Sequence, residues 1–178
     1  MSFVEVKDAG IQAAFNRVIL TGQNPAPILL AIGEHVTGRI KYRFRTATAP
    51  DGTPWKSNAQ STIENYVYAK GGFSKQTGKI LKRGAAAAMS KRPLQGESGD
   101  LARQIDYALE RDSMIVAANA VYAAMQHFGG TKAEFPNLWG DISARPFMPI
   151  MESGALYPEE QRDIVALVNE DLRRMTAG

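Results

Sequence analysis

Apolar residues recur at every third or fourth position in two stretches near the N-terminus, and this spacing predicts amphipathic helices. The first helix is expected from about Ala9 to Thr21, with Asp8 as its N-cap. The second is expected from about Asn24 to Thr46, because Asn24 is a good cap and Pro25 suits the first helical position. Its inward-facing positions are Leu29, Ile32, Val36, Ile40 and Phe44.

Helical spacing returns in three later stretches of the chain. One helix is expected from about Ser61 to Lys70, with Ser61 or Asn58 as its cap, and another over about Lys79 to Met89, where a run of alanines favours helix. The last helix is expected to open at Pro158, because the two glutamates that follow suit the positive end of the helix dipole. Its inward-facing positions are Ile164, Val168, Leu172 and Met175.

In the middle of the chain the apolar period changes to two, which is typical of strands. The alternating apolar residues are Ile105, Tyr107 and Leu109, followed by Met114, Val116 and Ala118. The turn-forming residues 110–113 separate the two runs, so the pattern predicts a β-hairpin. The order of elements predicts one α+β domain over residues 1–178, with helices packed on a small antiparallel sheet.

Composition excludes several classes of protein. No apolar run approaches the roughly 20 residues of a membrane span, and the first residues lack the pattern of a secretory signal. The absence of cysteine excludes disulfides and thiolate metal sites, and it agrees with a protein made in the cytoplasm.

Charge is distributed unevenly, although the formal net charge is only +3. Twelve Lys and Arg stand against two acids between Arg39 and Arg92, and four of these cations crowd the end of the second helix as a basic patch. From Glu152 onward the balance turns acidic. Each charge taken singly is explained by a solvated face. Taken together, opposite charges suit head-to-tail association, and a positive rim suits passing nucleic acid.

Residues 70–92 combine seven cations with glycines and alanines and contain no acid. We expect this stretch to be a mobile basic insertion. It is either a solvent-exposed segment without a partner or an arm that orders against a neighbouring subunit or DNA.

Candidate chemistry is sparse. There are two histidines, and His35 stands within the second helix, where a structural position is expected. His127 and Glu134 together supply too few ligands for a zinc site, so His127 is expected to hold a loop by hydrogen bonding. Neither a nucleophile elbow nor a phosphate-binding loop is present. We therefore expect no enzyme activity, no metal and no cofactor.

Two short motifs are expected to act together as a conformational latch. The first, Tyr122–Gly130, predicts a short helix that Gly129 and Gly130 end with a left-handed exit. The second, residues 143–148, contains an Arg-Pro-Phe turn. Phe147 is expected to fill the core. Arg145 either pins a loop to a carboxylate or to carbonyls, or anchors a neighbouring subunit, and we favour the second.

These motifs resemble those of the phage virion morphogenesis proteins, the tail-completion family of Mu-like and P2-like tailed phages. The resemblance extends over roughly residues 39–151. It rests on Pro50-Asp-Gly-Thr-Pro-Trp55, Ser98-Gly-Asp-Leu101, Tyr122–Gly130 and Ala144-Arg-Pro-Phe147, in that order.

The resemblance implies a structural virion protein, assembled in the host cytoplasm, that forms a homo-oligomeric ring, expected to be a hexamer. Such a ring caps the tail tube at its head-proximal end, contacts the tail tube protein and the head–tail connector, and surrounds the passing genomic DNA. The expected latch or subunit-interface residues are Trp55, Tyr122, His127, Phe128, Gly129, Gly130, Arg145, Pro146 and Phe147. The residues expected at a DNA-facing lumen are Lys75, Lys79, Lys82 and Arg83.

Two alternatives stay open. The protein is instead a neck or head-completion protein on the portal side, or, in a different class, a basic DNA-binding module. A linear fall of log affinity with log salt on free DNA would favour the second alternative.

Overall fold

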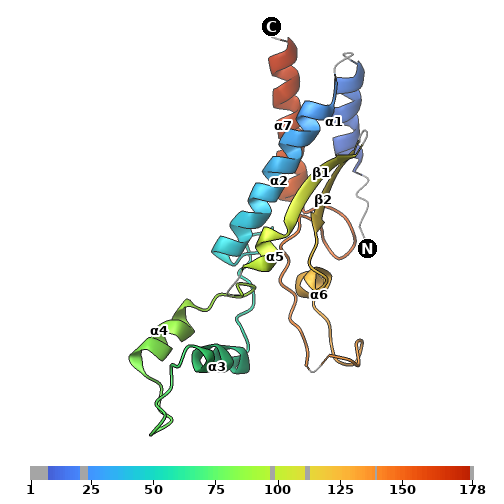
Figure 1. Cartoon of the computed structure of the whole chain (residues 1–178). Coiled ribbons are helices and arrows are strands. Elements are labelled where there is room, and N and C mark those ends of the chain that lie inside the picture. Colours follow the sequence, from blue (N-terminus) through green and yellow to red (C-terminus); the bar gives the residue numbers. More distant parts are fainter. Residues whose placement is uncertain (1–7, 21–23, 97–98, 111–112, 139, 177–178) are drawn as a thin grey trace.

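The long helix α2 (Ala26–Thr46) is the element on which the rest of the chain packs (Figure 1). The computed structural model describes residues 8–20, 24–96, 99–110, 113–138 and 140–176. All five apolar positions expected to face inward on α2 are buried. Asn24 accepts a hydrogen bond from the backbone N–H of Ala26 at 3.0 Å, but Pro25 and not Asn24 occupies the N-cap position, so α2 begins one residue later than predicted.

Helices α1 (Ala9–Leu20) and α7 (Pro158–Thr176) pack on each other, and α7 also packs on α2. Asp8 caps α1 as expected, because its carboxylate accepts a hydrogen bond from the N–H of Ile11 at 3.0 Å. On α7, Ile164 and Val168 are buried as predicted, whereas the side chain of Met175 lies outside the described residues. These helices enclose one continuous apolar core.

The predicted hairpin is present. Strands β1 (Ile105–Glu110) and β2 (Ser113–Ala118) are antiparallel, with Ile105 opposite Ala118 and Tyr107 opposite Val116. The short helix α5 (Asp100–Arg103) leads into β1, and the hairpin packs on α2. The chain is therefore an α+β protein with helices on a small antiparallel sheet, as the sequence predicts.

A single glycine allows the hairpin to approach α2 closely. A Cβ at Gly33 would lie 2.9 Å from Cγ of Tyr107 and would overlap the ring more severely at Cδ2. Any other residue type at this position would require the ring of Tyr107 to move. Gly38, one turn further along α2, has nothing within 4 Å of such a Cβ.

Helices α3 (Gln60–Ala69) and α4 (Lys82–Ser90) pack on each other and extend away from the rest of the chain (Figure 1). We call residues 59–92 the α3–α4 arm. The backbones of Gly72 and Gly84 cross in contact, since a Cβ on Gly72 would lie 2.5 Å from the Cα of Gly84. Neither helix has a side-chain cap: Ala59 stands at the start of α3, and the side chain of Asn58 donates instead to the carbonyl of Lys91. Helix α4 begins three residues later than predicted, which leaves Lys79 in the preceding loop.

The remaining elements are a short helix, α6 (Ala123–Phe128), and extended segments that connect it to α7. Residues 143–148 are irregular and reach the C-terminal end of α2, where Phe147 contacts Phe44. Trp139 lies outside the described residues.

Candidate functional site

Three motifs that are far apart in the sequence meet at the C-terminal end of α2. Phe44 lies 5.4 Å from the ring of Trp55 and 5.2 Å from the ring of Phe147, measured between centroids. His127 stacks edge-on against Phe147 at 5.1 Å. From here on, the name latch refers only to the residues that meet in this cluster: Trp55, His127, Arg145, Pro146 and Phe147. The phenyl ring of Phe147 is fully buried at its centre, as predicted.

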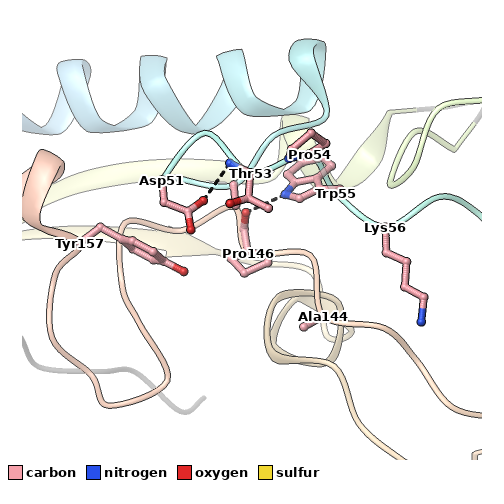
Figure 2. A pocket seen from close by; sticks show the side chains of 9 residues that line it. Asp51, Thr53, Pro54, Trp55, Lys56, Ala144, Pro146 and Tyr157 are labelled. Atoms are coloured by element: carbon pink, nitrogen blue, oxygen red, sulfur yellow. Dashed lines mark hydrogen bonds between the residues drawn. The ribbon is translucent and has the colours of Figure 1, made fainter.

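Trp55 connects the turn of residues 50–55 to the Arg-Pro-Phe segment by a hydrogen bond. Its turn is held by the carboxylate of Asp51, which accepts a hydrogen bond from the N–H of Thr53 at 2.9 Å. The indole Nε1–H donates to the carbonyl of Pro146 at 2.8 Å (Figure 2). A buried indole N–H needs such an acceptor, because leaving it unpaired costs the full desolvation penalty.

Arg145 is buried and holds backbone carbonyls within its own chain. Its Nε donates to the carbonyl of Lys56 at 2.9 Å, and its Nη2 donates to that of Ser57 at 3.0 Å. Burial lowers the pKa of Arg145 from its usual value. Arg145 therefore holds a loop of its own chain through backbone carbonyls, which is one of the two predicted roles. The other role, an anchor for a neighbouring subunit, stays a prediction.

His127 is hydrogen-bonded on both ring nitrogens. Nδ1 accepts from the N–H of Phe147 at 3.0 Å and from that of Met148 at 3.3 Å, so Nε2 carries the proton that bonds to the carbonyl of Ile150 at 3.1 Å. This tautomer requires a neutral ring. Burial lowers the pKa of His127 to about 4, and the nearby charge of Arg43 contributes in the same direction. His127 holds the loop, as expected from the sequence.

The two glycines after α6 have different functions, and the predicted paired left-handed exit is wrong. Only Gly129 has a positive φ, at 77°, and its ψ of −171° lies in a region essentially restricted to glycine. Gly130 pairs with Ile142 in a β-bridge, and a Cβ there would lie 2.6 Å from the sulfur of Met125. A larger residue at this position would thus displace the side chains of Met125 and Phe135.

Tyr122 and Phe128 lie at the two ends of α6 and are only partly buried, and the ring of Phe128 packs edge-on against His127 at 4.4 Å. Tyr122 precedes the first residue of α6, so its predicted place within the helix is one residue wrong. The two side chains are 45% and 41% exposed, which leaves them available to another molecule. Val121 and Phe135, close to them in sequence, are also exposed apolar residues.

A buried ion cluster beside the latch was not predicted. Arg43 is buried, pairs with the carboxylate of Glu160, and donates through Nη1 to the carbonyl of Phe147 at 2.9 Å. Arg39 donates to the same carboxylate at 2.7 Å and also pairs with Asp163. The expected basic patch at the end of α2 is therefore wrong for these two arginines, because their charges are neutralised by α7. Desolvation lowers the pKa of Arg43 from its usual value, and the Glu160 carboxylate opposes that shift.

The sequence carried a signal for this cluster. Arg43 follows Ile40 by three residues and so falls on the buried stripe of α2. Glu160 precedes Ile164 by four residues and falls on the buried stripe of α7. A charge of opposite sign on each of two apolar stripes indicates a buried pair.

An open pocket lies next to the latch, and Figure 2 shows its lining. It is lined by Ala49, Asp51, Thr53, Pro54, Trp55, Lys56, Ala144, Pro146 and Tyr157. Burial, followed by the charge of Asp51, raises the pKa of Tyr157. Glu134, once considered with His127 for a metal, instead accepts hydrogen bonds from the backbone N–H and hydroxyl of Thr131. Within the described ranges, no group of three or more His, Cys, Asp or Glu side chains is placed to hold a metal ion.

The four cations expected to face DNA lie away from the latch, on the α3–α4 arm, and all four are exposed. Lys75 and Lys79 flank the turn before α4, and Lys82 and Arg83 are its first two residues. The structure therefore separates the two predicted groups of residues into two distinct regions.

Comparison with known proteins identifies one family. The sequence model of the phage virion morphogenesis family matches residues 6–172. No curated protein and no solved structure matches the chain significantly. In the part of the chain that the structure describes, no helix is both long and apolar enough to cross a membrane.

Proposed function

Because the chain belongs to the phage virion morphogenesis family, it has a structural or assembly function in phage virions, and we propose that it caps the tail tube at its head-proximal end and joins tail to head. In this proposal its work is structural and not catalytic. Its partners are further copies of itself, the tail tube protein and the head–tail connector.

The observation that carries the proposal is the convergence of the family-like motifs on the latch. Three of the four motifs meet there, and Leu101 of the fourth is buried in the same core. The indole of Trp55, the imidazole of His127 and the guanidinium of Arg145 all bond to backbone groups of other segments. Polar side chains used in this way fix the shape of a surface, which is what an assembly subunit requires.

We place the contact with a second copy at the exposed apolar side chains around α6. Tyr122 and Phe128 are partly exposed, Phe128 packs against His127, and aromatic residues are enriched at the centres of protein interfaces. A heterologous contact of this kind closes into a ring when its rotation allows, and a hexamer is the ring that we propose.

Opposite charges at the two ends of the chain contribute less to this contact than the sequence suggests. Glu160 is buried, Asp163 pairs with Arg39, and Glu159 pairs with Arg162. These acids already have partners within the chain. The proposed subunit contact therefore depends mainly on apolar side chains.

The test is electron microscopy of particles produced with this gene silenced. We expect filled heads without tails, beside tails of abnormal and often excessive length. Tails of normal length beside detached heads would overturn the capping function and favour a neck protein on the portal side. Normal, intact virions would overturn both.

A further inference from the structure

The α3–α4 arm carries a concentration of positive charge that neither the latch nor the proposed ring contact uses. Its basic residues are Lys70, Lys75, Lys79, Lys82, Arg83, Lys91 and Arg92. The arm contains a single acid, Glu64, whose carboxylate accepts a hydrogen bond from Gln60 at 2.9 Å. The arm extends away from the body (Figure 1), and all of these side chains except the half-buried Lys91 are exposed.

The backbone fixes where these cations stand. Lys75 and Lys79 lie in a tight turn that is closed by hydrogen bonds from Ser74 to Lys79 and from Gly78 to Ser74, both at 2.9 Å, and by a bridge between Phe73 and Ile80. Arg83 is held at the base of this turn, because its Nε donates to the carbonyl of Gly71 at 2.8 Å.

Three of the cations have no partner for their charge. Among the residues that the structure describes, the ammonium groups of Lys75, Lys79 and Lys82 make no hydrogen bond or ion pair. The placement of Lys82 also does not stabilise the arm, because Lys82 is the first residue of α4, where the helix dipole disfavours positive charge.

Lysine is the informative residue type here. Protein–protein interfaces are depleted in lysine at their centres, whereas lysine and arginine together neutralise phosphates in sequence-independent binding of nucleic acids. We propose that the α3–α4 arm binds the phosphate backbone of nucleic acid through Lys75, Lys79 and Lys82, without reading its sequence. This binding is a property of the single chain and does not depend on the proposed place in the tail.

The test is fluorescence anisotropy of the purified full chain with two duplex DNAs of unrelated sequence, measured over a series of salt concentrations. We expect equal affinity for both duplexes and a linear fall of log affinity with log salt. In the variant Lys75→Gln/Lys79→Gln/Lys82→Gln, affinity at low salt should fall by about tenfold or more. The slope should decrease by up to about 3, because each phosphate contact contributes about 0.9.

A matched control removes three exposed cations outside the arm: Arg17→Gln/Arg103→Gln/Lys132→Gln. This variant has the same net charge and should keep the slope and most of the affinity. Equal losses in the two variants would overturn the proposal, because binding would then follow net charge alone. So would equal competition by polyglutamate, which would indicate an acidic protein surface as the partner, and so would no binding by the unmodified chain. A negative result here would not affect the proposed tail-capping function, which is tested separately by the length of tails in silenced particles.

Discussion

The backbone N–H of Phe147 donates a hydrogen bond to Nδ1 of His127 at 3.0 Å, and the two residues are twenty positions apart. The bond joins the end of α6 to the buried Arg-Pro-Phe segment. It requires an unprotonated nitrogen in a place that water does not reach.

The stability of the fold should therefore depend on pH through His127. Its pKa is about 4 in the folded chain and about 6.5 in the unfolded one, so the unfolded state takes up a proton first as the pH falls. Stability from this group is complete above about pH 6.5 and is lost between about pH 6.5 and 4, by roughly 3 kcal/mol in total. Urea unfolding at a series of pH values measures this loss. The variant His127→Asn should lack this part of the pH dependence, and an unchanged profile would contradict the assignment.

Arg43 should be the most costly charge to remove. In Arg43→Met the carboxylate of Glu160 stays buried and keeps only the half-exposed Arg39, so the free energy of unfolding should fall by about 3 kcal/mol. Arg43→Met/Glu160→Met should recover most of this loss, because both charges of the buried pair are then removed. Denaturant unfolding is the measurement. The control Arg162→Met breaks an exposed pair with Glu159 and should change stability by less than about 0.5 kcal/mol.

The glycines of α2 offer a matched pair of alanine substitutions. Gly33→Ala should destabilise the fold by about 1–3 kcal/mol despite alanine's higher helix propensity, since its methyl group would overlap the ring of Tyr107. Gly38→Ala meets open space in the same helix and should stabilise it by roughly 1 kcal/mol. Thermal unfolding of the two variants compares them directly. Equal effects at the two positions would mean that the hairpin does not rest on Gly33.

One substitution should destabilise the α3–α4 arm without destabilising the body. In Gly84→Ala the added methyl group would lie 2.9 Å from the Cα of Gly72, where backbone atoms cannot yield easily. Hydrogen exchange should accelerate throughout α3 and α4, while exchange in α2 and the hairpin stays unchanged. The exposed control Ala86→Ser on the same helix should leave exchange in the arm close to normal. Slowed or unchanged exchange in Gly84→Ala would contradict the Gly72–Gly84 crossing.

Substitutions in the latch should lower stability, whereas substitutions in the proposed subunit interface should impair assembly without lowering stability. Arg145→Lys keeps the charge but loses the planar fork that holds two carbonyls, so stability should fall by about 1–2 kcal/mol. Tyr122→Ala, at an exposed position, should leave stability within about 0.5 kcal/mol and yet impair assembly of tails. Unfolding midpoints and infectious titre are the two measurements. Normal titre in Tyr122→Ala would remove this residue from the proposed ring contact.

Local patterns predicted the elements well where one physical cause dominates. The apolar period gave the stripe of α2 and the two strands of the hairpin, because burial on one face leaves a regular trace in the sequence. Asp8 was recognisable as a cap for a similarly local reason. The absence of a side-chain cap on α3 was not predictable, because the side chain of Asn58 is used by a contact with Lys91, 33 residues away.

What the sequence did not provide is the partner of each polar side chain. Arg145 was correctly singled out, yet its acceptors are backbone carbonyls, which every residue possesses. The contrast between Gly129 and Gly130 arises from a bridge to Ile142, and no local rule predicts that pairing. The ion pair of Arg43 and Glu160 could have been predicted from the sequence, because each residue stands on the apolar stripe of its helix.

The base of the α3–α4 arm is fastened on both sides, and this has a mechanical consequence. Arg145 grips the chain at Lys56 and Ser57 where it enters the arm, and Gln95 bonds to the carbonyl of Phe44 shortly after the chain leaves it. A load applied at the tip of the arm is therefore expected to act on the latch and on the last turn of α2. Force on the arm would therefore act on Arg145 and on the carbonyl of Phe44, both of which belong to the buried region of the body.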